Sequence, residues 1–210
     1  MNYGQLKTEV ADTNLGRDDA ESAVIAGKAI NWILTEYLPA RGLKPFLVNT
    51  NLTTTDTVEY VALPDNFAGL KSARVLQSGG DYIGLADFEW SQFDEVETGE
   101  PTEKMVLPST TGWRLYLRLT PDDTYTINIW YFARQTELTA DGTTPILSTI
   151  YGDAPIISGA TWRTAVVLGL KDAISRWDYT FRKIDFPELL AFQARIEGRK
   201  KYSPTRSPYL

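Results

Sequence analysis

Two runs of alternating apolar and polar residues, joined by a Pro-Asp-Asp break, constrain the fold of this chain more than any other feature. Residues 113–119 and 124–132 both alternate with the period of a half-buried β-strand. Pro121 between them presets the first corner of a turn, and the two aspartates that follow also favour turns. The pattern therefore predicts a β-hairpin. The predicted buried faces carry Leu115, Leu117 and Leu119 on the first strand, and Tyr125, Ile127, Ile129 and Tyr131 on the second.

Helices are predicted at both ends of the chain from apolar residues at helical spacing. They cover residues 3–12, 19–38, 153–178 and 187–197. Asp18 or Asp19 is the expected N-cap of the second helix. Asp153 is the expected cap of the third, with Pro155 in its first turn.

Between these helices the sequence predicts a block of short strands. Strand-like segments occur at 45–55, 57–64, 71–77, 82–85 and 104–107. Residues 87–96 have helical character, and residues 135–149 form a long polar connection. The order predicts an α+β fold, in which the N- and C-terminal helices form one helical bundle with an inserted antiparallel β domain. The predicted parts are 1–44 (N-terminal helices), 45–152 (β domain), 153–197 (C-terminal helices) and 198–210 (extended basic tail).

The chain contains no histidine and no cysteine. This absence excludes disulfides, thiol nucleophiles and Ser-His-Asp catalysis, and it argues against a zinc site. We therefore expect no enzyme activity of those classes, no metal and no cofactor. No apolar run approaches the length of a membrane helix, and no signal-peptide pattern opens the sequence, so we expect a protein made in a cytoplasm without membrane contact.

The formal net charge of −6 argues against a protein that grips duplex DNA over its whole surface. The C-terminal tail differs, because residues 198–210 carry four basic side chains and no acidic one. Such a run is either a solvated tail or a docking segment, and its aromatic and apolar end favours docking. The candidate docking residues are Arg199, Lys200, Lys201, Tyr202, Arg206, Tyr209 and Leu210.

Acidic residues gather around the predicted helix at 87–96. They are Asp87, Glu89, Asp94, Glu95, Glu97 and Glu100. A pair of carboxylates can hydrolyse a glycoside, but a solvated helix face explains the same cluster. The Gly79-Gly80-Asp81 segment is a turn signal and lacks the spacing and lysine of a phosphate-binding loop.

Arginine and aromatic residues flank the predicted hairpin. They are Arg114, Arg118 and Arg134, with Tyr116, Trp130 and Tyr131. Such a stripe can hold single-stranded nucleic acid by stacking, but the same residue types are common at protein interfaces. The acidic total favours a subunit or tail interface, with Arg114, Arg118, Trp130 and Arg134 as candidates. Trp32 lies off the apolar stripe of its helix and is either another interface residue or the edge of the core.

Three motifs, in order, resemble the head-to-tail adaptor proteins of tailed bacteriophages, including the tubular tail protein A-like group. Residues 60–75, with Leu63-Pro64-Asp65 and Phe67, are similar to a strand, corner and strand of that family. Residues 87–94 resemble its short helix. Leu115-Tyr116-Leu117 through Tyr131-Phe132 resembles its hairpin.

This resemblance implies a structural virion protein at the head–tail junction, assembled in the host cytoplasm. It implies a homo-oligomeric ring, usually a dodecamer, between the portal protein and a tail or nozzle protein. DNA would pass through the ring without specific binding, and the C-terminal tail would dock into the portal. Two other functions stay open: a carbohydrate-binding or hydrolytic tail-associated domain, and a single-stranded nucleic-acid-binding protein.

Overall fold

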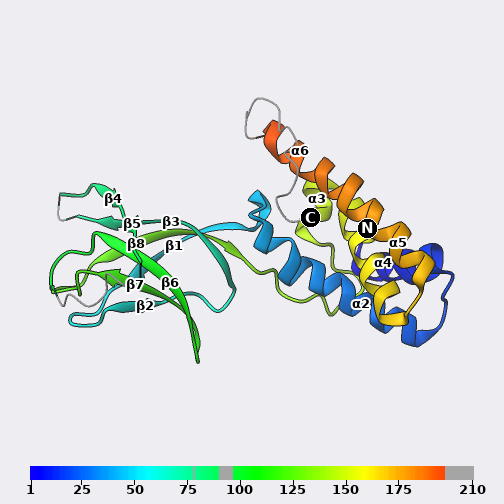
Figure 1. Cartoon of the computed structure of the whole chain (residues 1–210), viewed down its shortest axis with the longest axis horizontal. Coiled ribbons are helices and arrows are strands. Elements are labelled where there is room, and N and C mark those ends of the chain that lie inside the picture. The colour runs from blue at the N-terminus through cyan, green and yellow to red at the C-terminus, as the bar shows by residue number, and fades with distance from the viewer. Residues whose placement is uncertain (78, 90–96, 197–210) are drawn as a thin grey trace. The chain divides into compact units, whose positions relative to one another are not determined.

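The computed structural model describes residues 1–77, 79–89 and 97–196. The chain divides into two compact units, which are described separately below. The helical unit contains Met1–Pro45 and the chain from Gln135 onward, and the β unit is Phe46–Arg134 (Figure 1). The predicted α+β class is therefore confirmed.

The N-terminal part of the helical unit consists of two helices, each of which continues into a π-helical turn. Their bounds are α1 (Tyr3–Thr8) with η1 (Glu9–Thr13), and α2 (Ala20–Trp32) with η2 (Ile33–Tyr37), followed by the 3-10 turns η3 (Pro39–Arg41) and η4 (Lys44–Phe46). The predicted N-cap is confirmed, because Asp19 Oδ1 accepts a hydrogen bond from the Ser22 backbone N–H at 2.7 Å. That backbone bond, helped by the Ser22 hydroxyl, lowers the pKa of the Asp19 carboxyl.

The C-terminal part contains α3 (Ile146–Tyr151), α4 (Ala154–Leu168), α5 (Lys171–Tyr179), η6 (Thr180–Asp185) and α6 (Phe186–Ile196). The single helix predicted over 153–178 is wrong, since it ends at Leu168 and restarts at Lys171. Gly169 adopts a left-handed φ of 69° and caps α4, with its N–H bonded to the Val166 carbonyl. A left-handed C-cap glycine is a common helix stop.

Helix α4 packs against α2, η2 and η6. A Cβ atom on Gly159 would lie 2.7 Å from Ile33 Cδ1 and 2.9 Å from a ring carbon of Phe181, so only glycine allows this approach without displacement. On α4, Val167 is 57% exposed whereas Thr161 is fully buried.

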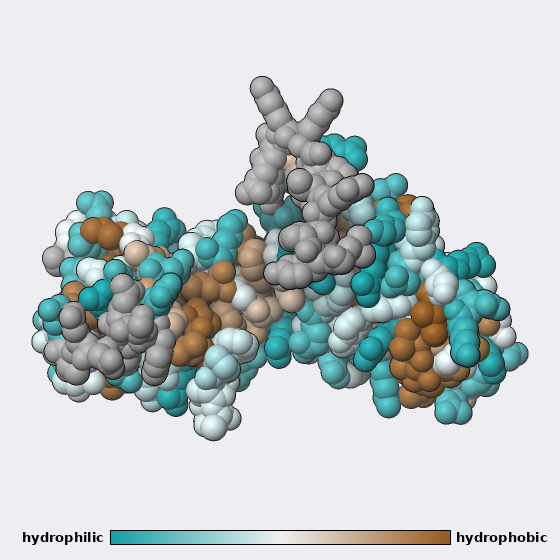
Figure 2. All heavy atoms as spheres, in the orientation of Figure 1, coloured by the Kyte–Doolittle hydropathy of each residue, from teal (hydrophilic) through white to brown (hydrophobic). Residues whose placement is uncertain are grey.

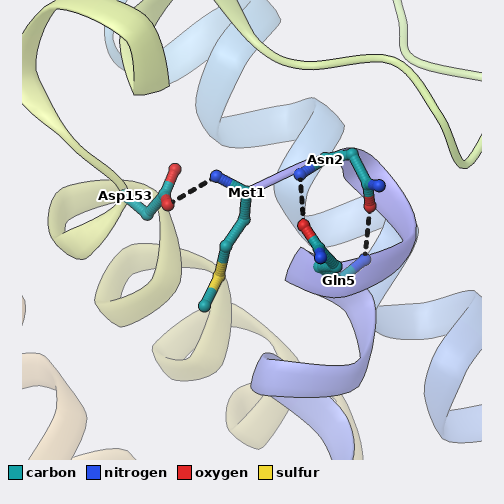
Figure 3. Close-up of polar contacts among 4 residues, drawn as sticks. All are labelled: Met1, Asn2, Gln5 and Asp153. Carbon is teal, nitrogen blue, oxygen red and sulfur yellow. Dashed lines mark hydrogen bonds and ion pairs between the residues drawn. The ribbon is translucent and has the colours of Figure 1, made fainter.

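The first residues of the chain are fixed to α4. The α-amino group of Met1 donates to Asp153 Oδ2 at 2.7 Å, and Asn2 and Gln5 form a reciprocal capping box at the start of α1 (Figure 3). As predicted, Asp153 is the N-cap residue of α4 and Pro155 lies in the first turn. Its side chain makes no cap hydrogen bond, because its carboxylate pairs with the α-amino group of Met1.

The 135–149 connection belongs by its contacts to the helical unit, whereas the sequence predicted it as the end of the β segment 45–152. The side chain of Asn31 on α2 bonds both backbone groups of Leu138, accepting from its N–H at 2.9 Å and donating to its carbonyl at 3.1 Å. Leu138 is buried, and the segment then enters α3.

The described residues of the β unit form two four-stranded sheets. The strands are β1 (Leu47–Thr53), β2 (Tyr60–Ala62), β3 (Phe67–Leu76), β4 (Tyr82–Gly84), β5 (Ala86–Asp87), β6 (Glu103–Ser109), β7 (Gly112–Arg118) and β8 (Thr126–Ala133). The first sheet has the antiparallel order β1-β8-β3-β4. The second has the order β2-β7-β6-β5, in which only the β5–β6 pair is parallel.

The predicted hairpin between the two central runs is wrong, because β7 and β8 lie in different sheets. Strand β7 forms its hairpin with β6, through the two residues between Ser109 and Gly112. After β7 the chain turns out of the second sheet at Leu119, which has a φ of 61°. It enters the first sheet where the Thr54 N–H donates to the Tyr125 carbonyl at 2.9 Å.

The predicted buried faces are nevertheless correct at most positions. Leu115, Leu117, Ile127, Ile129 and Tyr131 are all buried and belong to one core cluster shared by the two sheets. Leu119 and Tyr125 are only half-buried, because they lie on the link between the sheets. The alternating pattern thus predicted the faces of the strands but not their partners.

The link between β7 and β8 contains a tyrosine, Tyr125, whose pKa is shifted by a neighbouring carboxylate. The Tyr125 hydroxyl donates to Asp122 Oδ1 at 2.6 Å, and this hydrogen bond raises the pKa of Tyr125 to about 12. Because the folded pKa lies above the ordinary value near 10, the stabilisation is complete below that value and is lost as the pH rises through about 12. Asp122→Asn should return one of the 11 tyrosines to a pKa near 10, measured by phenolate absorbance. Superimposable titration curves of the two proteins would contradict this assignment.

Candidate functional site: two arginine–aromatic surfaces

Several predicted site residues lie outside the described residues. These are all the candidate docking residues of the tail: Arg199, Lys200, Lys201, Tyr202, Arg206, Tyr209 and Leu210. Most of the predicted helix at 87–96, including Asp94 and Glu95, also lies outside them. At its start, Asp87 belongs to strand β5 and pairs with the buried Lys104, so this acidic residue has a structural partner.

The described residues contain no group of three or more His, Cys, Asp or Glu side chains that could hold a metal ion. Over the same part of the chain, no helix is long and apolar enough to cross a membrane. Pockets in the described helical unit are open surface hollows, for example the one between α1 and the Asp141 loop. The candidate sites are therefore surfaces rather than pockets.

Trp32 lies in an aromatic cluster of the helical unit. Its ring centroid is 5.4 Å from that of Tyr37 and 6.3 Å from that of Trp162. Phe181, which is fully buried, stacks beneath Trp162 with an interplanar angle of 16°. Trp32 is therefore the half-buried edge of this cluster, which is one of the two positions predicted for it.

Arginines lie over three half-buried rings of this cluster. Arg41 is 4.7 Å from the Tyr37 centroid, Arg163 is 4.8 Å from that of Trp32, and Arg182 is 4.9 Å from that of Trp162. Each such cation–π contact contributes roughly 0.5–1 kcal/mol at an exposed site. Arg182 is also fixed by Asp178, at 2.8 Å. We call these six residues the helical arginine–aromatic surface.

A second surface of this type lies on the outer face of the second sheet. The Arg114 guanidinium lies 3.9 Å from the Tyr60 ring centroid, and Tyr60 contacts Tyr116 with centroids 5.7 Å apart. On the same face Arg118 Nη1 pairs with Glu103 Oε2 at 2.9 Å. Strand pairing places these residues side by side, since Tyr60 is opposite Tyr116 and Glu103 is opposite Arg118. We call these five residues the sheet arginine–aromatic surface.

The other predicted interface residues are not part of the sheet surface. Trp130 lies on β8 in the first sheet, and Arg134 follows the end of that strand, where its N–H bonds the Asn66 carbonyl at 2.6 Å. Tyr131 is buried in the core, and its hydroxyl donates to Asn66 Oδ1 at 3.0 Å. The arginines and rings of the predicted stripe therefore lie on two sheets and in the core, not on one continuous surface.

The sequence reasoning missed a polar network on the outer face of the first sheet. Asn128 donates to Asn49 Oδ1 at 3.1 Å and to Asn51 Oδ1 at 2.8 Å. It also accepts from Arg74 at 3.3 Å, which lies over the Tyr82 ring. Asn49 and Asn51 lie two positions apart on β1, and this spacing alone predicts that they share one face of the sheet.

Apolar residues also reach the surface of the helical unit. Figure 2 shows apolar areas that interrupt the otherwise hydrophilic surface on the face it presents. Large apolar side chains with high exposure in this unit include Val24, Val167, Tyr179, Ile184 and Phe192. Exposed apolar groups and arginines are both common on protein–protein contact surfaces.

Comparison with protein families gives one assignment for nearly the whole chain. The model of the SU10 adaptor protein family matches residues 1–196, which include both units. No curated protein matches the chain. The match covers the α2–α4 helical pair and both sheets, and it stops where the described structure stops. On this evidence the chain belongs to the SU10 adaptor protein family, a family of phage head-to-tail adaptors.

Proposed function

We propose that this structural virion protein forms a homo-oligomeric ring, a dodecamer, between the portal protein and a tail or nozzle protein. The observation that carries the proposal is the family match across residues 1–196. In this ring the helices from both ends of the chain form one bundle, with the β unit inserted between them. The protein assembles in the host cytoplasm, and the ring provides a channel through which DNA leaves the head.

The two arginine–aromatic surfaces are the proposed contacts with neighbouring subunits or with the tail. Arginine, tyrosine and tryptophan are the residues most often found at the centres of interfaces. Here the guanidinium groups are already held against rings, at 3.9 Å for Arg114 and 4.8 Å for Arg163. Less side-chain freedom is then lost when a partner binds, and this preorganisation favours association. Trp130 and Arg134 remain proposed contacts on the first-sheet side of the β unit.

A substitution tests the helical surface directly. Arg163→Glu should leave the fold intact, since Arg163 is exposed, but it places a negative charge over Trp32 and removes the cation. We expect at least a tenfold loss of self-association or portal-dependent assembly, measured by analytical ultracentrifugation. Arg17→Glu makes the same charge change at an exposed residue of the η1–α2 loop and should assemble normally. Equal assembly of both variants would remove the helical surface from the interface.

The acidic total of the chain suits a DNA channel. A net charge of −6 opposes contact with phosphates, so DNA can slide through the ring without binding to it. The purified protein should therefore give no shift of duplex or single-stranded DNA at physiological salt. A shift that weakens steeply as salt is added would contradict this part of the proposal.

The tail at 199–210 is the proposed portal-docking arm, because its basic and aromatic residues suit an extended docking segment. The test is co-sedimentation with portal rings of the full-length chain and of a chain cut after Glu197. We expect the full-length chain to bind and the truncated chain, folded by circular dichroism, to stay in the supernatant. Equal binding would move the portal contact to the helices or the sheets, and binding by neither would contradict the adaptor role.

A further inference from the structure

Strand β1 forms an edge of the first sheet. It pairs with β8 through all seven of its residues, Leu47 to Thr53, without a bulge. Among the residues that the structure describes, no strand pairs with its other side. A regular open edge presents a row of unpaired backbone N–H and C=O groups, which is a template for a further strand.

The β1 edge lacks the features that usually protect such a strand. Its sequence, Leu-Val-Asn-Thr-Asn-Leu-Thr, contains no charged residue and no proline. Natural proteins block open edges with short strands, charges, prolines or bulges. The other described edges follow this rule by length, since β2 and β4 have three residues each and β5 has two. The β1 edge is therefore the one described edge suited to pairing with another strand.

The ladder shows which backbone groups are available on this edge. Thr54 donates its N–H to the Tyr125 carbonyl, and the register with β8 continues unbroken from Thr53 to Leu47. In an antiparallel ladder alternate residues turn their backbone groups toward the partner strand. The backbone N–H and C=O groups of Leu52, Thr50 and Val48 therefore point toward β8. The groups that face outward belong to Leu47, Asn49, Asn51 and Thr53.

The side chains along the edge are also divided between two faces. Val48 and Leu52 lie on the core face, where Leu52 packs against the core and Val48 remains 39% exposed. Asn49 and Asn51 lie on the opposite face, where both bond Asn128. A strand that pairs here must therefore place apolar side chains on the core face and uncharged polar ones on the other.

We propose that the β1 edge binds β1 of a second copy of this chain, antiparallel about a two-fold axis through Thr50. In this register Val48 is opposite Leu52 of the partner subunit, and Asn49 is opposite Asn51 of the partner subunit. All four outward-facing residues then pair with outward-facing residues. Moving the axis to Asn49 or Asn51 leaves two residues of each strand unpaired. The edge is thus complementary to itself in its hydrogen bonds, its apolar contacts and its lack of charge.

This contact goes beyond the proposed ring and differs from it in symmetry. A two-fold contact uses the same surface on both copies, whereas a ring closes through two different surfaces. The β1 dimer therefore belongs to the free protein before assembly, and it must separate before the chain joins a ring. A seven-residue strand pair buries less area than a standard stable interface, so the dimer should form reversibly with concentration.

Analytical ultracentrifugation of the free chain tests the contact. We expect the wild-type protein to shift from monomer to dimer as its concentration rises. Val48→Lys places a charge against Leu52 of the partner subunit twice per dimer and should abolish the shift. The control, Ile83→Lys, makes the same kind of change at a 46% exposed residue on β4, the opposite edge of the same sheet, and should dimerise normally. A monomer at every concentration, or equal behaviour of the two variants, would overturn the proposal.

The absence of cysteine permits a test of the register itself. In Thr50→Cys the two new thiols face each other across the two-fold axis at a non-hydrogen-bonded pair, where strands approach closely enough for a disulfide. Mild oxidation should give a covalent dimer. Val48→Cys exposes its thiol more but places it opposite leucine, so it should cross-link at least tenfold more slowly. Cross-linking of Thr50→Cys no faster than of Val48→Cys would overturn the two-fold register, whatever the result of the portal-binding experiment.

Discussion

Phe181→Ala should lower the free energy of unfolding of the helical unit by about 3–5 kcal/mol. Phe181 is fully buried and contacts three other rings, with centroid distances of 5.2 Å to Tyr37, 6.2 Å to Trp162 and 5.9 Å to Phe186. Truncation removes the support beneath the helical arginine–aromatic surface and leaves a cavity beside Gly159. The loss is measured as a shift of the denaturation midpoint at constant slope.

Phe192→Ala is the matched control for this variant. Phe192 lies on α6 of the same unit, is 40% exposed and contacts one ring, that of Tyr151 at 5.3 Å. The same chemical change should cost about 1 kcal/mol or less there, since less apolar area is lost from the interior. If the two variants were equally stable, Phe181 would not be the centre of the aromatic cluster.

Ile129→Ala should lower the free energy of unfolding of the β unit by about 2–5 kcal/mol. Ile129 is fully buried on β8, between Thr50 of β1 and Ala73 of β3. Its side chain belongs to the core that the two sheets share, so the cavity would loosen both sheets.

Ile83→Ala provides the comparison within the same sheet. Ile83 is 46% exposed on the edge strand β4, so its truncation should change the stability by less than about 1 kcal/mol. A small loss for Ile129→Ala, similar to that for Ile83→Ala, would show that the shared core is not packed as described.

The sequence predicted the faces of strands better than their partners. Alternation at period two identifies which side chains share a face, and Leu117 and Ile129 are buried as expected. It does not identify the neighbouring strand. The Pro-Asp-Asp break predicts a hairpin turn, but a turn-forming segment can also lead from one sheet to the other, as it does here through Leu119.

The two glycines of the predicted 153–178 helix show a similar limit. Gly159 continues α4 and allows close packing against Ile33, whereas Gly169 takes a left-handed conformation and ends the helix. A glycine within an apolar helical pattern fits both roles, and local sequence alone does not separate them. The close approach of Ile33, more than a hundred positions earlier in the chain, is what requires glycine at position 159.

The candidate surfaces were predicted only where their residues are close in sequence. Arg114 and Arg118 lie four positions apart on β7 and share one face, because side chains on a strand alternate with period two. The sequence does not predict Arg163 and Arg182, because each lies over a tryptophan that is distant in the chain. The resemblance to phage adaptors, carried by motif order across the whole chain, is confirmed by the family match.

The most direct test of the adaptor role is electron microscopy of particles assembled without this chain, with the wild-type protein supplied again as the control. The account predicts filled or leaking heads and separate tails in its absence, and joined particles when it is restored. Normal tailed particles assembled without the chain would contradict its role at the head–tail junction.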